Sequence, residues 1–298
     1  MPVAHPQLQP FLDYLKFEKR YSRHTVLSYE NDLTGFFDFL ELQFGAVSLA
    51  EITHSFIRSW LASLKDAGLS AKTLNRKISA LRSFFKYGLK TGALTQSPMV
   101  KVVAPKNEKR LPQFVADKDI RTLFDYVEFP DTFRGRTERL ALELFYQTGM
   151  RLSELTGLKE SAVNAATGAL KVLGKGNKER IIPVGDALLA HIAAYLDEKK
   201  ARDGADRGVL LVSEKGKPLQ PRAVYTFVKK YLSLVTTIDK RSPHVLRHTF
   251  ATHLTGAGAE LNAVKELLGH SSLAATQVYT HNTIEKLRQV HQNFHPKG

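Results

Sequence analysis

Apolar residues recur at intervals of three and four along the first hundred residues, which is the period of an amphipathic helix. The pattern predicts four helices, over residues 8–20, 23–44, 50–68 and 71–92. Ser22 and Ser70 directly precede two of these segments, where a serine side chain caps a helix N-terminus. Gly68 ends the third, as glycine often does after the last helical residue. Four such helices with short turns predict a small bundle.

The helical pattern breaks between residues 100 and 115, where Pro105 and Pro112 disfavour helix. Three basic residues stand between these prolines, namely Lys106, Lys109 and Arg110. We expect a basic linker at 107–113, between an N-terminal domain at 1–106 and a C-terminal domain at 114–298.

The second half has mainly helical periodicity, with one insert that is typical of strands. In "ALKVLGKGNKERIIPV" two short runs of Leu, Val and Ile flank a glycine-rich turn, which predicts a β-hairpin. "GVLLV" at 208–212 suggests a further short strand. The expected fold is therefore mainly α with a small β-sheet.

The charge of the chain narrows the choice of partner. Its 43 Lys and Arg residues against 29 Asp and Glu give a formal net charge of +14, which favours nucleic acid as the partner, with a merely solvated basic surface as the alternative. The sequence contains no cysteine, so a disulfide framework, a thiolate nucleophile and a cysteine-ligated metal are excluded. We find no signal peptide and no apolar run of about 20 residues. We expect a cytoplasmic protein without a membrane partner.

Two candidate residues lie at turns. Arg151 in "TGMRLSEL" follows Gly149, where one helix is expected to end and the next to begin. An arginine there can place a bidentate fork on a phosphate, or it can form a structural pair with Glu154. Lys175 in "GKGNKER" is expected at the hairpin tip, where it either donates a proton to a leaving oxygen or is a solvated turn residue.

The stretch "SPHVLRHTF" places His244, Arg247 and His248 close together on one predicted helix. A zinc site of the HExxH type needs a carboxylate between the histidines, whereas Val245, Leu246 and Arg247 stand there, so phosphate binding is favoured over metal. His270 follows Gly269 at the expected end of another helix, and Tyr279 lies nine residues further on. A single tyrosine among ten usually serves packing.

Taken in this order, the residues resemble the tyrosine recombinase (phage integrase) family, and most closely its Xer-type members. The resemblance is carried by Arg151 in "TGMRLSEL", Lys175 in "GKGNKER", His244 and Arg247 in "HVLRH", His270 in "LLGHSS" and Tyr279 in "TQVYTH". It implies an N-terminal four-helix SAM-like core-binding domain and a C-terminal mixed α/β catalytic domain. None of the six positions departs from the family pattern.

The resemblance implies that Tyr279 is the nucleophile that forms a 3′-phosphotyrosyl link to DNA. Arg151 and Arg247 would stabilise the charge on the phosphorane, and Lys175 would protonate the leaving 5′-oxygen. His244 and His270 would share proton transfer and phosphate positioning in an undecided way, with Glu154 and His248 as supports. No cofactor or metal is expected.

The implied role is resolution of chromosome dimers at dif-like sites during cell division. The implied assembly is a tetramer on two DNA sites, with a paralogous recombinase and a DNA translocase as further partners. Alternatives are a mobile-element integrase, a type IB topoisomerase and a non-catalytic DNA-binding regulator. After the nucleophile, Ile284, Leu287 and Val290 form an apolar stripe, which we expect to pack on a neighbouring protomer or, alternatively, on its own domain.

Overall fold

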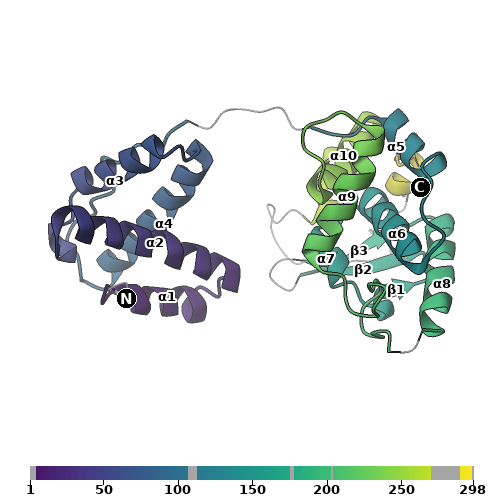
Figure 1. Cartoon of the computed structure of the whole chain (residues 1–298), viewed down its shortest axis with the longest axis horizontal. Coiled ribbons are helices and arrows are strands. Elements are labelled where there is room, and N and C mark those ends of the chain that lie inside the picture. The colour runs from purple at the N-terminus through teal and green to yellow at the C-terminus, as the bar shows by residue number, and fades with distance from the viewer. Residues whose placement is uncertain (1–4, 107–112, 175–177, 203, 270–288, 297–298) are drawn as a thin grey trace. The chain divides into compact units, whose positions relative to one another are not determined.

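The computed structural model describes residues 5–106, 113–174, 178–202, 204–269 and 289–296. The chain divides into two compact units, Met1–Arg110 and Leu111–Gly298, each with its own arrangement of elements in Figure 1. Helices dominate both units, and the described strands form one three-stranded sheet in the second unit. The predicted mainly helical fold with a small sheet is confirmed. The expected linker at 107–113 lies, apart from Gln113, outside the described residues.

The described part of the N-terminal unit, residues 5–106, contains four α-helices and two short turns of other helical types. These are α1 (Leu8–Asp13), a π-helical turn (Tyr14–Glu18), α2 (Arg23–Phe44), a 3₁₀ turn (Leu49–Glu51), α3 (His54–Asp66) and α4 (Ala71–Lys90). Ser22 and Ser70 cap α2 and α4 by accepting hydrogen bonds from the backbone N–H groups of Thr25 and Thr73. Local capping therefore fixes where the two longest helices begin.

The apolar stripes of these helices meet in an aromatic core. Leu33 and Phe36 of α2, Trp60 of α3, and Phe84 and Phe85 of α4 are almost fully buried. Phe36 and Trp60 lie with ring centroids 5.1 Å apart, and Phe36 and Phe85 6.5 Å apart. The unit thus buries a core of its own, as a domain requires.

The buried carboxylate of Asp32 engages part of the basic surface of α4. It pairs with Arg76 and, at 2.9 Å, with the ammonium group of Lys77. Arg82 donates instead to the backbone carbonyl of Val102 at 3.1 Å. Arg76, Lys77 and Arg82 therefore make contacts within the bundle. Lys72, on the same helix, is exposed to solvent.

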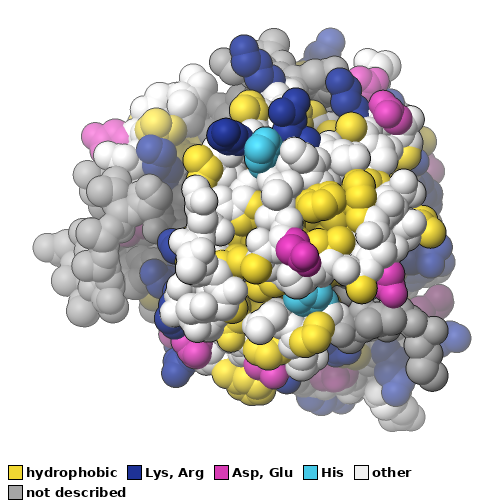
Figure 2. Space-filling view, turned by 90° about the vertical axis from the view of Figure 1, so that its left-hand side faces the viewer, with side chains coloured by type: hydrophobic (Ala, Val, Ile, Leu, Met, Phe, Trp, Pro, Cys, Tyr) yellow, Lys and Arg dark blue, Asp and Glu magenta, His cyan; other side chains and the backbone are white. Residues whose placement is uncertain are grey.

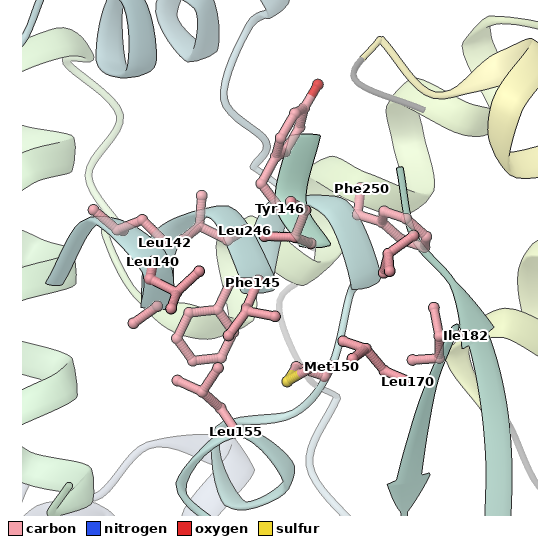
Figure 3. Close-up of a cluster of buried hydrophobic side chains, with 14 of the residues drawn as sticks. Leu140, Leu142, Phe145, Tyr146, Met150, Leu155, Leu170, Ile182, Leu246 and Phe250 are labelled. Carbon is pink, nitrogen blue, oxygen red and sulfur yellow. The ribbon is translucent and has the colours of Figure 1, made fainter. Parts of the chain in front are cut away.

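The C-terminal unit arranges seven α-helices around the sheet in its described part. The elements are α5 (Asp117–Asp125), α6 (Phe133–Thr148), α7 (Leu152–Thr156), a 3₁₀ turn (Glu160–Ala162), β1 (Val163–Asn164), β2 (Ala169–Leu173), β3 (Glu179–Pro183), α8 (Asp186–Lys200), α9 (Pro221–Val235), α10 (Pro243–Gly256) and α11 (Leu261–Leu268). α6 is the central helix, and its residues from Leu140 to Thr148 are nearly all buried. Figure 3 shows Leu140, Leu142, Phe145 and Tyr146 of α6 surrounded by side chains of other elements.

The sheet is antiparallel in the order β1-β2-β3. β2 and β3 form the predicted hairpin, closed at its described end by a 2.7 Å hydrogen bond from the Gly174 N–H to the Lys178 carbonyl. The expected strand at 208–212 is wrong, because Val209 and Val212 form only isolated bridges. Leu210, Leu211 and Val212 are nevertheless buried, so the apolar run there serves the core.

The described part of the tail packs on its own unit. Residues 289–294 are helical, and Val290 is 8% exposed within the core of the C-terminal unit. His291 and His295 donate through Nε2 to the carbonyls of Gln147 and Tyr146, at 2.8 and 3.1 Å, in the last turn of α6. Val290 therefore packs on the tail's own domain, which is the second of the two alternatives given above. Ile284 and Leu287 lie outside the described residues.

The surface is rich in cations and carries scattered apolar side chains. Figure 2 shows one face on which Lys and Arg gather toward the upper edge, with few acidic groups among them. Among the described helices, none is both long enough and apolar enough to cross a membrane.

Candidate active site

The junction between α6 and α7 places Arg151. Gly149 ends α6 in the left-handed conformation, with φ +59°. Met150 is fully buried and anchors the turn, in the same hydrophobic cluster as Leu155, Leu170 and Ile182 (Figure 3). Arg151 then becomes the residue that precedes α7, and its side chain stays 29% exposed. A glycine turn and a buried methionine thus direct an arginine towards solvent from a rigid base.

Glu154, one turn into α7, is the buried carboxylate of this region, with a side chain 2% exposed. Its Oε1 accepts from Arg151 Nη1 at 2.7 Å and from Arg180 Nη1 at 3.0 Å. Its Oε2 accepts from the Arg151 backbone N–H at 2.7 Å and from Arg180 Nη2 at 2.8 Å. Four hydrogen bonds satisfy both carboxylate oxygens. The structural pair of Arg151 and Glu154, one of the two alternatives above, therefore exists in this structure.

These contacts determine the charge of Glu154. Burial alone would raise the pKa of its carboxyl, but the hydrogen bonds and positive charges of Arg180 and Arg151 outweigh burial and lower that pKa to about 2. Glu154 is consequently ionised throughout the physiological range, and its single negative charge is shared by two guanidinium groups.

Arg247 lies in α10, which begins with Pro243 in its first turn as the sequence predicts. It is 8% exposed and donates from Nη1 to the Gly149 carbonyl at 2.6 Å and from Nη2 to the Leu268 carbonyl at 2.7 Å. Burial and the positive charges of Arg151 and Arg180 lower the pKa of Arg247 to about 10. It still carries a full charge at neutral pH, at an electrostatic cost that a nearby anion would remove.

The carbonyls at the end of α11 draw the cations together. Arg180 Nε, Arg247 Nη2 and Arg151 Nη2 donate to the carbonyls of Leu267, Leu268 and Gly269 respectively, at 2.8, 2.7 and 3.2 Å. The C-terminal end of a helix is the negative end of its dipole, so it favours cations. The structure thus brings Arg151 and Arg247 together at one site.

His244 lies three residues before Arg247 on the same helix and is exposed, while His248 is half-buried one turn further on. Lys175, His270 and Tyr279 lie outside the described residues. Described glycines stand directly before two of these positions. Gly174 precedes Lys175, and Gly269 precedes His270. Both glycines lie against Arg180.

Arg180 is the member of this cluster that the sequence motifs did not single out. It lies in β3, is 4% exposed, and shares the buried face of the strand with Ile182, while Ile181 between them is half-buried. This alternation is a signal that was available, because an arginine at an inward-facing strand position requires a buried acceptor.

The cluster is suited to bind a phosphodiester. Each guanidinium group carries five N–H donors in a planar fork, and the contacts described above use two on Arg151 and two on Arg247. Three guanidinium groups against one carboxylate leave an excess of positive charge at this point. Such a preorganised set can stabilise the additional negative charge of a pentavalent phosphorus.

Comparison with known proteins agrees with this geometry. Residues 113–286 match the phage integrase family, and residues 8–92 match the phage integrase N-terminal SAM-like domain. The tyrosine recombinase XerC of Staphylococcus saprophyticus is 39% identical over 290 residues, covering 97% of this chain and 97% of that protein. The XerC of Chlorobaculum parvum is 35% identical over 316 residues, covering 97% of this chain and 94% of that protein.

Solved structures share the fold. The XerH recombinase in a post-cleavage complex with a palindromic difH substrate superposes with a TM-score of 0.71 at 20% identity, covering 96% of this chain and 81% of that one. A λ integrase tetramer bound to a Holliday junction superposes with a TM-score of 0.69 at 21% identity, covering 92% of this chain and 80% of that one. The matched families span both units, and the chain belongs to the phage integrase family of tyrosine recombinases, enzymes that cut and rejoin DNA at specific sites.

Proposed function

We propose that this recombinase is of the Xer type and resolves chromosome dimers at dif-like sites during cell division. Support comes from the XerC relatives, which match nearly the whole length of the chain, and from the difH complex of a protein with the same fold. The proposed location is the cytoplasm, where chromosomal DNA is accessible. If the chain instead serves a mobile element, its preferred site will not be dif-like.

The proposed chemistry is a transesterification at phosphorus. The phenolic oxygen of Tyr279 forms a bond to the scissile phosphorus, and the bond from phosphorus to the 5′-oxygen breaks. Lys175 gives its proton to that leaving oxygen, which becomes a free 5′-hydroxyl. Attack by a 5′-hydroxyl from another strand reverses these steps and releases the tyrosine. The phosphodiester bond energy is conserved, so neither ATP nor another energy source enters the balance.

Arg151, Arg247, His244 and His270 complete the proposed site. The two arginines contact the non-bridging oxygens and stabilise the charge that grows on them in the transition state. The two histidines position the phosphate and take part in proton transfer from Tyr279, because a free phenol, with a pKa near 10, is a poor nucleophile at neutral pH. Arginines fill the electrostatic role that a metal has in other phosphoryl-transfer enzymes, so we propose no cofactor.

The observation that carries this proposal is the convergence of Arg151 and Arg247. Arg151 directly precedes α7 and Arg247 lies in α10, far apart in the sequence, and both donate to backbone carbonyls at the end of α11. Arg151 keeps a partly exposed side chain, and His244 is exposed on the helix of Arg247. A phosphate here would meet a partly neutralised cationic cluster with donors in fixed positions.

Double-stranded DNA is the proposed substrate, and a tetramer on two DNA sites is the proposed assembly. The λ integrase tetramer on a Holliday junction, which has the same fold, supports this architecture. We further propose a paralogous recombinase and a DNA translocase as partners, because dimer resolution requires the two sites to be brought together after replication.

Replacement of Tyr279 by phenylalanine tests the nucleophile. The change removes one oxygen and keeps the ring, so we expect Tyr279→Phe to bind a dif-like half-site with unchanged affinity and to form no covalent adduct. A nicked dif-like duplex that traps the adduct, followed by a denaturing gel and sequencing of the attached DNA, is the measurement. The wild type should form the adduct equally well in EDTA.

The matched control is Tyr126→Phe, because Tyr126 is 80% exposed in the same unit and should tolerate the change without effect. An adduct with Tyr279→Phe that survives denaturation would overturn the assignment of the nucleophile. Loss of cleavage in EDTA would show that a metal is required. Adducts of the wild type only at sites unlike dif would favour the mobile-element alternative.

A further inference from the structure

Arg180 lies under the proposed site and is shielded from solvent. We propose that Arg180 is a positioning residue for DNA cleavage, which holds Glu154, and through it Arg151, in the orientation that receives the scissile phosphate. This inference rests on the function proposed above, and it adds a residue outside the six proposed to act there.

The contacts of Arg180 are those of a fixed support. Its Nη1 and Nη2 form a bidentate fork on Glu154, at 3.0 and 2.8 Å, and its Nε donates to the Leu267 carbonyl at 2.8 Å. A bidentate pair of this kind fixes the plane of the carboxylate as well as its distance. Because the side chains of Arg180 and Glu154 are 4% and 2% exposed, water does not compete for these bonds.

Glu154 passes this orientation to Arg151. The same Oε1 that accepts from Arg180 also accepts from Arg151 Nη1, and the same Oε2 also accepts from the Arg151 backbone N–H. If Arg180 were absent, the carboxylate could rotate and Arg151 would be its one remaining cation within the described cluster. Arg151 would then pair with a carboxylate whose plane is no longer fixed, so its guanidinium group would lose the orientation that receives phosphate.

Arg180 also packs against the backbone before two further proposed residues. A Cβ atom placed on Gly269 would lie 3.0 Å from Arg180 Cδ, and one placed on Gly174 would lie 3.5 Å from Arg180 Nη1. These glycines directly precede His270 and Lys175. The buried Arg180 side chain therefore lies against three parts of the proposed site: the start of α7, the residue before the β2–β3 turn and the end of α11.

Arg180 itself is placed to support other residues and not to touch DNA. Its side chain is 4% exposed, against 29% for Arg151, and its three described hydrogen bonds go to protein acceptors. A misplacement of about 1 Å in a site of this kind can reduce the rate about 10²-fold. The effect of losing Arg180 should therefore appear in cleavage and not in DNA affinity.

The experiment compares Arg180→Met and Arg180→Lys with the wild type as full-length proteins. We expect half-site affinity within about twofold of the wild type. Single-turnover adduct formation at saturating protein should fall about 100-fold in Arg180→Met and about tenfold in Arg180→Lys, which keeps a charge but has no fork. The matched control is Arg136→Met, since Arg136 forms a similar bidentate pair with Glu198, at 2.6 and 2.7 Å, on the exposed surface. It should cleave like the wild type.

The pH dependence distinguishes positioning from general loss of structure. Removing Arg180 takes away the cation that most lowers the pKa of Glu154, so Glu154 in Arg180→Met should take up a proton at a higher pH and release Arg151. We expect the ratio of variant to wild-type cleavage rates to be several-fold smaller at pH 5.5 than at pH 7.5. A merely structural defect in a folded protein would give one ratio at both pH values.

Each outcome of these experiments either supports or overturns the positioning role of Arg180. Wild-type cleavage by either folded Arg180 variant, or a ratio that is independent of pH, would overturn the positioning role. If Arg180→Met does not fold, as circular dichroism would show, Arg180→Lys carries the test alone, with the same affinity and rate criteria. Arg151→Ala is measured in parallel, because normal cleavage by that variant would overturn the proposed site and not the assignment of Arg180 alone.

Discussion

Arg247 combines two tasks that usually fall to different residues. It joins the Gly149 carbonyl to the Leu268 carbonyl, so it links the end of α6 to the end of α11, and it places a cation beside Arg151. Its lowered pKa near 10 reflects burial and the neighbouring arginines, yet that value leaves it protonated across the range in which the enzyme is assayed. A bound phosphate would stabilise this charge further.

Replacement of Arg247 by alanine should therefore reduce cleavage far more than binding. Loss of one preorganised donor to a transition-state oxyanion costs about 3 kcal/mol or more, which is about 10²-fold in rate. Affinity is spread over many phosphates and should change little. The measurement is half-site affinity by gel shift beside the single-turnover rate of adduct formation.

Arg247→Ala also leaves two buried carbonyls without their donor, which costs about 1–3 kcal/mol for each group. Its unfolding temperature must accordingly be measured, and cleavage compared well below it. Arg222→Ala, on the exposed side of α9, is the control for loss of one positive charge. Equal losses of affinity and rate would show that Arg247 only positions DNA.

The residues of the site differ in how far the sequence predicted them. Arg151 and Arg247 follow from local signals, a glycine-terminated helix and a proline-started helix, and the structure brings them together. Arg180 was not predicted, because its partner Glu154 is 26 residues away and meets it only once β3 lies beside α7. Tertiary contacts of this kind leave no local pattern apart from the inward position of a charged residue in a strand.

At the scale of elements, Gly149 controls how closely α6 approaches α10 and α11. Its φ of +59° favours glycine, and an added Cβ would lie 2.5 Å from Phe250 Cδ1 and 2.9 Å from Leu268 Cδ2. α10 carries Arg247, and the end of α11 supplies the carbonyls on which the arginines converge. The close approach at this glycine is thus a condition for the geometry of the site.

Gly149→Ala should destabilise the protein for two separable reasons. The left-handed backbone costs about 1–2 kcal/mol for alanine, and overpacking adds about 1–3 kcal/mol. Gly204→Ala is the matched control, since Gly204 has φ +70° and a Cβ there would meet nothing within 4 Å. Urea unfolding of both variants should show the larger loss for Gly149→Ala, together with reduced cleavage. Equal losses in the two variants would contradict the close packing.

The elements were predicted best where capping and period agree. Ser22 and Ser70 marked the starts of α2 and α4, and Gly149 and Gly269 marked the ends of α6 and α11. Residues 208–212 were expected to form a strand, but an apolar run reports burial and not hydrogen-bond pairing. The tail was expected on a neighbouring protomer, whereas Val290 packs on its own unit. The sequence shows that an apolar face must be covered. It does not show whether the same chain or a neighbouring protomer covers it.

At the scale of the whole molecule, both units contain histidines whose burial favours the neutral form. In the N-terminal unit His5 stacks on Phe37 with ring centroids 4.1 Å apart, and burial lowers its pKa. In the C-terminal unit His253 donates from Nε2 to the Val115 carbonyl and accepts the Tyr146 hydroxyl at Nδ1. His291 lies in the tail, stacked on His295 at 4.8 Å.

These histidines predict that the protein loses stability in mild acid. Burial lowers the folded-state pKa of His253 and His291 below the unfolded value of 6.5, against smaller opposing effects of the Val115 and Gln147 carbonyls and, for His253, of Asp117. The unfolded chain therefore binds more protons below that pH, so their contribution is complete above about pH 6.5 and is lost as the pH falls towards the lowered values. We expect the urea midpoint to be lower at pH 5.5 than at pH 7.5. His253→Gln and His291→Gln together should flatten this dependence, while the exposed His24→Gln should not. A midpoint that does not change with pH in the wild type would contradict the burial of neutral histidines.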